Sequence, residues 1–477
     1  MLVDRRWLLR SAAAVAALAA AKPLMGSAEA SEVAVESLAS SPPTGPTVVP
    51  LDLFTSDTFN DQALFALGAA SSQSAEVGEV LRIAQLINAR TGDPADPGVD
   101  AFDAYCDAFS KYGAEIAHLA ASSGAAHSVT TRNRLMRSST YAAQELFFVL
   151  GSAHGSREEQ VFEKAQSRWL QSVALFDPSV EHAEVASPFG PIPVHFFPSP
   201  SGSGRRPTVI ISEGSDGQNV ETMQFGVTAA LARGYNVVLF EGPGQMTPLF
   251  TRSVIFTADW NRVVAPVLAW ARGRSDVGQV ALIGISFGGM LCSRAAARVK
   301  GLDAVVLEPA AYDFTTMWGD QKSMALVKET YRAPAEEKDG ASRGLNAGFL
   351  ATWPSMPRVE QFTIYKRGSI FNRQVQREAR AGKPLSDYYG LLESMLPFRF
   401  SRDFREITIP TLVLANEGDP FFGSQPEQAY ELLDSVPRSR KSLVHLTAQK
   451  GASLHDQPVG PQVAEEAVFD WLDDQLS

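Results

Sequence analysis

The pattern of apolar positions divides the chain into a helical part and a later part in which strands and helices alternate. Between residues 52 and 180, apolar side chains recur every three or four positions, which is the spacing of one face of an α-helix. One such stripe consists of Val77, Val80, Leu81, Ala84 and Ile87. Ser156 and Glu159 have the spacing of a capping box and predict the start of another helix. We therefore expect an all-helical domain over residues 52–180.

From residue 181 onward the pattern becomes that of strands. Residues 182–200 alternate on either side of a Pro-Phe-Gly-Pro turn and predict a β-hairpin. Short apolar runs then alternate with helical stretches. These runs lie at residues 208–214, 236–242, 279–286, 304–310, 411–419 and 442–448. Nearly continuous apolar strands separated by helices predict a doubly wound, mostly parallel sheet that is covered on both faces.

The strand pattern is interrupted once. Residues 314–408 are helical and irregular in character, and the strands resume after them. We therefore assign residues 181–313 and 409–477 to one α/β core and treat residues 314–408 as an insertion into it.

The first 30 residues have the features of a twin-arginine export signal. Arg5 and Arg6 precede an Ala-rich apolar stretch over residues 11–21, and Ala28-Glu29-Ala30 has the small-x-small form of a cleavage site. The alternative is an N-terminal helix or membrane anchor, but the apolar stretch is shorter than the roughly 20 residues that span a bilayer. We expect cleavage after Ala30, a flexible leader over residues 31–51, and a periplasmic or secreted protein.

Charge and cysteine content restrict the partners and the chemistry. The formal net charge is −11, and no run of Lys or Arg is present, so we expect neither nucleic acid nor a membrane as a partner of the mature chain. The only cysteines are Cys106 and Cys292, which excludes a disulfide framework, and no Cys/His spacing resembles a metal site. We expect Cys292 to be a packed core residue.

Ser286 is the first candidate for chemistry. By itself a Gly-x-Ser-x-Gly motif is a weak signal, because it also occurs by chance, and the alternative is a small residue at a turn. Here the serine ends a predicted strand, a predicted helix begins at once, and Gly284 and Gly288 leave space for the two elements to approach. This arrangement is a nucleophile elbow, and it predicts Ser286 as a nucleophile.

A serine nucleophile needs a base, which on such a sheet follows it in the chain. Only His445 and His455 lie after the elbow. His445 lies within an apolar strand and is expected to be a satisfied residue of the sheet. His455 lies in the loop before the last helix and is our predicted base. Asp456, its neighbour, is expected to be a solvated loop residue.

The acid that orients the base should follow the preceding strand. Asp419 comes at the end of the run 411–419 and is the predicted acid, which would hold the imidazole and stabilise its charged form. Glu417, expected on the surface, and Glu308, after the run 304–310, are the alternatives.

Two N–H groups should stabilise the tetrahedral oxyanion. One is the backbone N–H of Phe287, directly after the nucleophile. The other should come from the loop after the run 208–214, where Ser215 is the candidate and Gly214 and Asp216 are the alternatives.

These linked segments resemble the α/β-hydrolase superfamily, and within it the 2,6-dihydroxypseudooxynicotine hydrolase-like group. That group is related to FrsA-type hydrolases and to fungal hydrolases that shorten polyketide chains. The segments that carry the resemblance are EGSDGQNVE, ALARGYNVVLFEGPGQ, FTADWNRVVAPV, ALIGISFGGML, PTLVLANEGDPFF, GASLH and, upstream, RNRLMRSSTYAAQELFF. The chain departs from similar sequences at Glu213, where glycine is frequent, at Met246, where a further glycine is usual, and at Pro420, where histidine is frequent.

The resemblance implies an α/β-hydrolase fold in which the helical domain closes over Ser286 and residues 314–408 form a lid. It implies a serine hydrolase that works through an acyl-enzyme, without metal or organic cofactor, on an ester or a ketone-adjacent C–C bond of a small or medium organic substrate. It also allows a homodimer. The alternatives are an aminopeptidase or acyl-peptide hydrolase, and a non-catalytic binding protein on a hydrolase scaffold.

Overall fold

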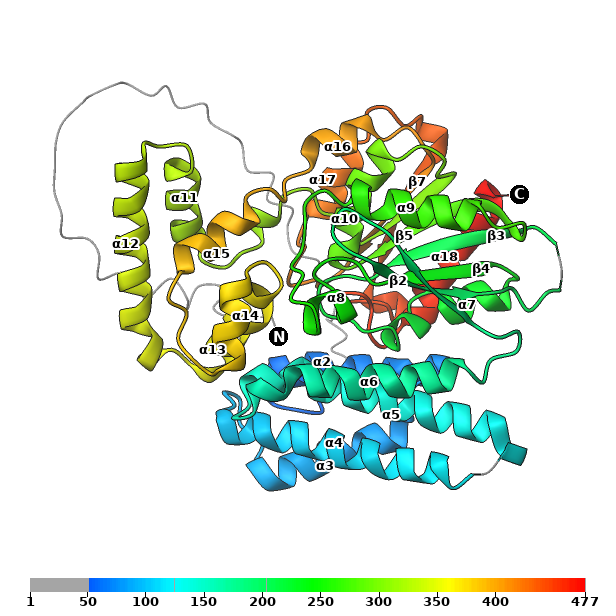
Figure 1. Cartoon of the computed structure of the whole chain (residues 1–477), viewed down its shortest axis with the longest axis horizontal. Helices are drawn as coiled ribbons and strands as arrows, with labels where there is room; N and C mark the ends of the chain where they lie inside the picture. The colour runs from blue at the N-terminus through cyan, green and yellow to red at the C-terminus, as the bar shows by residue number, and fades with distance from the viewer. Residues whose placement is uncertain (1–50, 124, 203, 477) are drawn as a thin grey trace.

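The computed structural model describes residues 51–123, 125–202 and 204–476, and its elements fall into three groups (Figure 1). Helices α2–α6 lie below the central sheet in this view, helices α11–α15 lie to its left, and the α/β core lies to the right. The predicted export signal and nearly all of the predicted leader lie outside the described residues.

An eight-stranded, mostly parallel sheet forms the core, with the strand order β1-β2-β4-β3-β5-β6-β7-β8. Strands β1 and β2 form the predicted hairpin, β2 is antiparallel to β4, and the remaining neighbours are parallel. The strands are β1 (Glu181–Val185), β2 (Ile192–Phe197), β3 (Arg206–Ser212), β4 (Asn236–Phe240), β5 (Val277–Ile285), β6 (Ala304–Glu308), β7 (Thr411–Asn416) and β8 (Lys441–Leu446). The predicted fold class is therefore confirmed, and each predicted strand is present.

Helices cover both faces of this sheet. Alternate residues of a strand point to opposite faces, so Ile210 and Leu282 pack with α9 and α10, whereas Ile211 and Ile283 pack with α7 and α18. The helices of the core are α7 (Val227–Ala232), α8 (Met246–Phe250), α9 (Asn261–Arg272), α10 (Phe287–Arg298), α16 (Ser401–Glu406), α17 (Gln425–Glu431) and α18 (Pro461–Gln475). Two-sided burial explains why these strands read as continuous apolar runs.

The N-terminal domain is built from helices around a cluster of aromatic rings. Its helices are α2 (Asp57–Gly68), α3 (Val77–Thr91), α4 (Val99–Ala121), α5 (Ser128–Phe148) and α6 (Glu158–Val173). Phe59 and Phe148 have ring centroids 5.0 Å apart, and Tyr105 lies 4.6 Å from Phe148. The predicted stripe on α3 is buried at Val80 and Ile87, but Val77 at the start of the helix is 49% exposed.

Two local predictions are wrong. Ser156 does not cap α6, because it lies inside a 3₁₀ turn over Gly155–Arg157 that runs directly into the helix. The helical stretch expected between the runs 208–214 and 236–242 is short, because Gly226 has a φ of 119° just before α7. In both places a tight turn replaces the helical start that the local pattern predicts.

Before α16, which packs on α10 of the core, the insertion contains five α-helices, and the third and fourth of these contact the N-terminal domain. The five helices are α11 (Gln321–Thr330), α12 (Ala335–Thr352), α13 (Arg358–Ser369), α14 (Arg373–Arg380) and α15 (Tyr388–Met395). Phe362 on α13 packs against Phe102 and Phe148, with centroid distances of 5.1 and 5.2 Å. Arg358 Nε donates to the carbonyl of Gly151 at 2.8 Å. Phe362 therefore joins the insertion to the aromatic cluster of the N-terminal domain.

Strand β8 forms one edge of the sheet, so His445 is partly exposed to solvent and is not the satisfied sheet residue that the sequence predicted. The residue lies on the predicted strand, but its side chain is 55% exposed, with Nδ1 3.7 Å from a carboxylate oxygen of Glu427. An edge strand leaves such a side chain in water.

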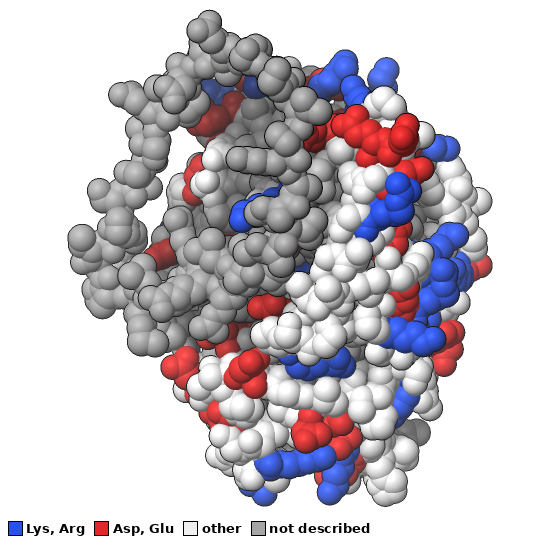
Figure 2. All heavy atoms as spheres, turned by 90° about the vertical axis from the view of Figure 1, so that its left-hand side faces the viewer, with Lys and Arg blue, Asp and Glu red and all other residues white. Residues whose placement is uncertain are grey.

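The surface and the helices give two further observations. On the face drawn in Figure 2, acidic and basic side chains of the described residues are interspersed where the atoms are not grey. None of the helices in the described part of the chain combines the length and apolar character needed to cross a bilayer.

Candidate active site

Ser286 lies on a strained turn between β5 and α10. Its φ is 54° and its ψ is −125°, a conformation that non-glycine residues rarely adopt. Its backbone N–H donates to the carbonyl of Glu308 on the neighbouring strand at 2.6 Å. A Cβ atom at Gly284 would lie 2.3 Å from the Gly288 carbonyl oxygen, and one at Gly288 would lie 2.4 Å from that of Ser212. The turn therefore requires both flanking glycines.

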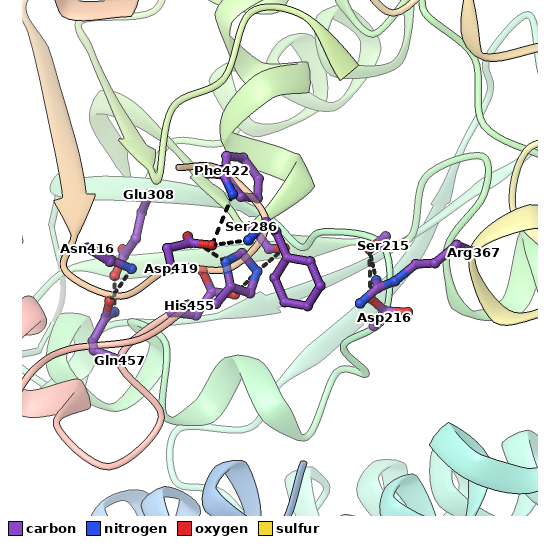
Figure 3. A network of polar contacts seen from close by, with 12 residues as sticks. Ser215, Asp216, Ser286, Glu308, Arg367, Asn416, Asp419, Phe422, His455 and Gln457 are labelled. Carbon is purple, nitrogen blue, oxygen red and sulfur yellow. Dashed lines mark hydrogen bonds and ion pairs between the residues drawn. The ribbon is translucent and has the colours of Figure 1, made fainter. Parts of the chain in front are cut away.

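Loops from two other strand ends bring His455 and Asp419 to this serine (Figure 3). Ser286 Oγ lies 2.8 Å from His455 Nε2, and His455 Nδ1 lies 2.9 Å from Asp419 Oδ2. The three residues that the sequence singled out thus form one continuous hydrogen-bonded row at the carboxyl ends of β5, β7 and β8.

The loop after β7 fixes the carboxylate of Asp419 and the ring of His455. Asp419 Oδ1 accepts hydrogen bonds from the backbone N–H groups of Phe421 and Phe422, at 2.8 and 3.0 Å. The Phe422 ring stacks on the imidazole with a centroid distance of 5.2 Å. These contacts leave Asp419 Oδ2 free to bond the imidazole and hold the ring in one orientation.

The two alternative acids are engaged elsewhere. Glu308 Oε1 accepts a hydrogen bond from Gln457, and burial raises the pKa of this carboxyl to about 8. Glu417 accepts from the backbone N–H of Ala448 at 2.9 Å and lies at the surface. The geometry therefore gives Asp419, and neither glutamate, as the partner of His455.

Asp456 is not the solvated loop residue that the sequence suggested. It is 5% exposed, and its Oδ2 lies 3.3 Å from His455 Nε2, the nitrogen that also faces Ser286. Positive φ angles at Leu454 and Asp456 turn the loop so that this side chain faces inward. Such backbone angles are not encoded in any local pattern, so the sequence carried no signal for this position.

The carboxyl groups around His455 change its proton affinity. Burial by itself lowers the pKa of the imidazole, but Asp456 and Asp419 outweigh this effect, and the pKa of His455 is raised above its usual value. Burial raises the pKa of Asp456 to about 7, although His455 opposes the shift. The charges of the ring and of this carboxyl therefore depend on one another.

The predicted oxyanion groups lie on both sides of Ser286. Phe287 begins α10, so its N–H has no acceptor within the helix. A Cβ atom at Gly214 would lie 2.7 Å from Ser286 Cβ and 3.0 Å from the Phe287 nitrogen, so the loop after β3 passes directly against the elbow. The side chain of Ser215 points away to Asp216 and Arg367, which leaves only backbone groups of this loop for an oxyanion (Figure 3).

Arg367 holds this loop and was not found from the sequence. Its guanidinium donates to Ser215 Oγ at 3.0 Å and forms an ion pair with Asp216. Because Arg367 comes from α13 of the insertion, sequence order gave no indication that it reaches this loop.

Two cavities meet at Ser286 and His455. The first, which we call the acidic chamber, has a volume of about 190 Å³ and lies between α2, the loop after β3 and α13. Its carboxyl groups are those of Asp57, Asp61, Glu213, Asp216, Glu221 and Asp456. The second, the aromatic chamber, has a volume of about 170 Å³ and is lined by Phe314, Trp318, Phe349, Tyr388, Phe421 and Phe422. The serine therefore faces one space in which carboxyl groups lie among aromatic rings and a second space with far fewer carboxyl groups.

Neither cysteines nor metal ligands contribute to this site. Cys292 is fully buried, as predicted, and burial raises the pKa of its thiol to about 12. Within the described ranges, no cluster of His, Cys, Asp and Glu has an arrangement that could hold a metal ion.

A doubly wound sheet with this elbow and this order of acid and histidine defines the class of α/β-hydrolases. Residues 218–460 match the family model described as "Alpha/beta hydrolase family", and the chain belongs to that family. It is therefore a hydrolase.

Comparisons with individual proteins also indicate a hydrolase of this family. The chain is 31% identical to the hydrolase LUC6 of a Fusarium species, over 88% of this chain and 97% of that protein. It is 28% identical to the 20-hydroxy-prefusarin hydrolase FUS2 of Gibberella moniliformis, over 51% of this chain and 58% of that protein. The solved structure of 2,6-dihydroxy-pseudo-oxynicotine hydrolase has the same fold, with a TM-score of 0.57, 17% identity, and coverage of 86% of this chain and 95% of that one. The resemblance to this group is confirmed.

Proposed function

We propose that the protein is a serine hydrolase that cleaves an ester or a ketone-adjacent C–C bond of a small or medium organic substrate. The observation that carries the proposal is the row of hydrogen bonds from Ser286 through His455 to Asp419, at 2.8 and 2.9 Å. Such a row is what an activated serine requires, because the hydroxyl must lose its proton as it attacks.

In the proposed reaction, Ser286 Oγ attacks the substrate carbonyl while His455 Nε2 takes the hydroxyl proton. Asp419 stabilises the resulting imidazolium. The N–H of Phe287 and a backbone N–H of residues 214–216 bind the oxyanion. The bond to the leaving group breaks, His455 gives that group its proton, and an acyl-enzyme on Ser286 remains.

Water then completes the cycle. His455 removes a proton from the water, the hydroxide attacks the acyl carbon, and the proton returns to Ser286 Oγ as the acid leaves. If a C–C bond is cleaved, the leaving group departs as a carbanion, so it must be stabilised by conjugation within the substrate. No step uses a metal or an organic cofactor.

Labelling with a fluorophosphonate, read by intact mass, tests the proposal. Attack by an activated serine displaces fluoride and adds one phosphonyl group. We expect a single adduct on the wild type and on Ser401→Ala, which removes an exposed serine on α16. We expect no adduct on Ser286→Ala or His455→Ala. A folded wild type without an adduct, or an adduct that persists in Ser286→Ala, would overturn the proposal.

We also propose that residues 1–30 direct export through the twin-arginine route. The paired Arg5 and Arg6 before an apolar stretch support this. Replacing both with lysine should keep the precursor in the cytoplasm of a bacterial host, whereas the wild type should appear outside it. Export of the double-lysine protein at the wild-type level would argue against the route.

A further inference from the structure

Two buried carboxyl groups in the acidic chamber have an oxygen without a partner. Glu213 Oε2, Asp456 Oδ1 and Asp216 Oδ1 are buried and make no hydrogen bond within the described residues, but Asp216 Oδ1 lies 3.7 Å from Lys366 Nζ. Glu213 and Asp456 are each 5% exposed, and both line the chamber together with Ser286. A buried polar group that lacks a partner destabilises a protein. Two such groups beside one serine therefore point to a ligand that supplies hydrogen-bond donors.

The surrounding loop leaves room for the Glu213 carboxyl, and its backbone is fixed by hydrogen bonds. A Cβ atom at Gly217 would lie 1.7 Å from Glu213 Oε1, so only glycine leaves room for this carboxyl. The Gln245 amide donates to the backbone carbonyls of both Glu213 and Gly214.

The position of Asp456 indicates which part of a substrate enters the chamber. Asp456 Oδ2 lies 3.3 Å from His455 Nε2, which is the atom that protonates the leaving group in the proposed reaction. His455 lines both chambers, but Asp456 lines only the acidic chamber, whereas Phe287, whose N–H is the predicted oxyanion group, lines only the aromatic chamber. The leaving part of the substrate therefore lies toward Glu213 and Asp456, and the acyl part lies toward the aromatic rings.

The charges of the acidic chamber favour a neutral donor over a cation. Lys366 and Arg367 already place two basic groups on its wall. Burial raises the pKa of Glu213 well above its usual value and raises the pKa of Glu221 to about 7. A protonated carboxyl donates one hydrogen bond and accepts another, which matches a hydroxyl group.

We propose that Glu213 and Asp456 bind hydroxyl groups on the leaving part of the substrate, while the aromatic chamber receives an apolar acyl part. The substrate class is thus an acyl compound with a hydroxylated leaving group. This inference rests on the proposed serine hydrolase function.

Two esters with the same acyl group test it. Glycerol monobutyrate carries hydroxyl groups on its leaving part, and propyl butyrate does not. We expect wild-type kcat/KM to be at least about tenfold higher for the glycerol ester, because a site built for hydroxyl groups discriminates against an analogue that lacks them. In Glu213→Met this ratio should fall several-fold, because Asp456 alone then remains to bind a hydroxyl group. The Glu213→Met protein should also melt at a higher temperature than the wild type, because the substitution removes an unpaired buried carboxyl.

Glu465→Gln is the matched control. Glu465 is also a carboxyl whose pKa burial raises, to about 7, but it bonds the backbone of Gly226 and lies outside the chamber. This variant should keep the wild-type ratio. The proposed hydroxyl-binding site would be overturned if Glu213→Met keeps the wild-type ratio of kcat/KM for the two esters. It would also be overturned if the wild type does not prefer the glycerol ester.

Binding to Ser286→Ala separates this inference from the proposed function, because it does not require turnover. In thermal-shift titrations, glycerol monobutyrate should stabilise Ser286→Ala more than propyl butyrate, and Glu213→Met in the same background should reduce the difference. Equal stabilisation by the two esters would overturn the subsite even if the enzyme is active. Stronger stabilisation by butyrylcholine than by either ester would also overturn it, since the chamber would then bind a cation.

Discussion

Asp456 Oδ2 and His455 Nε2 lie 3.3 Å apart, on the side of the imidazole that faces Ser286. The imidazole therefore has a carboxyl group near each of its nitrogens, since Asp419 bonds Nδ1. Both carboxylates stabilise the imidazolium form, and together they raise the pKa of His455. A base with a raised pKa becomes protonated, and therefore unable to accept a proton, at a higher pH.

Replacing Asp456 with asparagine should move the acid limb of the kcat/KM profile to lower pH. Only neutral His455 accepts the Ser286 proton, so activity falls as the pH drops through the pKa of the ring. Without the Asp456 charge this pKa falls, while Asp419, which raises it, and Arg367, which lowers it, remain. We expect a shift of about 0.5–1 pH unit. Rates measured from pH 4.5 to 9 check this.

Asp434→Asn serves as the control for that experiment, because Asp434 is 53% exposed and pairs with a surface arginine. Its profile should coincide with that of the wild type. An acid limb that stays in place in Asp456→Asn would show that Asp456 does not act on the charge of His455.

Glu308→Gln should make the stability of the protein less dependent on pH. Burial raises the pKa of Glu308 from 4.5 to about 8, so the native state keeps a proton that the unfolded state loses. Between pH 4.5 and 8 the unfolded state binds fewer protons, and the free energy of unfolding falls as the pH rises. Glutamine has no proton to lose. From pH 5 to pH 8 the variant should gain about 1–3 kcal/mol relative to wild type.

Urea unfolding at the two pH values measures this difference. Glu417→Gln, a surface substitution, should follow the wild type at both. Parallel stability changes in wild type and Glu308→Gln would mean that Glu308 is ionised in the folded protein.

Gly288→Ala should abolish most activity. The added Cβ would lie 2.4 Å from the backbone carbonyl oxygen of Ser212, which cannot move without shifting β3 against the elbow. We expect a loss of kcat of about 100-fold or more, because small displacements of reacting groups have effects of this size. The loss should be measured on protein whose fold is verified by circular dichroism.

Gly340→Ala is the matched substitution. Gly340 lies within α12 and has open space where a Cβ would be added. Here alanine should stabilise the helix by about 0.5–1 kcal/mol and leave kcat unchanged. Wild-type kcat in Gly288→Ala would contradict the close approach of strand and helix at the elbow.

Arg367 and Asp216 should act as a unit in positioning the loop after β3. Arg367 reaches from α13 to Ser215 Oγ and to the Asp216 carboxylate. Arg367→Met and Asp216→Asn should each lower kcat by about 10- to 100-fold, because the oxyanion groups lose their fixed position. The double variant should be no worse than the more impaired single variant.

A double-mutant cycle on kcat measures this coupling, with Arg402→Met on the exposed surface as the control. A coupling energy of about 1 kcal/mol or more is expected for residues in direct contact. Additive losses would mean that the two residues affect the reaction independently.

Much of the fold was encoded in local patterns. The apolar runs of β3 to β7 are buried on both faces, so they read as strands without reference to the rest of the chain. The glycines at 284 and 288 mark the turn at Ser286 because no side chain fits there. His455 and Asp419 could be selected because loops at the carboxyl ends of parallel strands converge at one edge of the sheet.

The surroundings of Ser286 were decided only by tertiary structure. Asp456 faces inward because of positive φ angles, and Glu213 is buried because the N-terminal domain and the insertion close over it. Arg367 comes from a helix more than 80 residues beyond the serine. Hydrophobic periodicity depends on neighbours within a few residues and determines strands, helices and their order. Burial of a particular polar side chain depends on which distant elements pack on it, and that information appears only once the three parts of the chain are assembled.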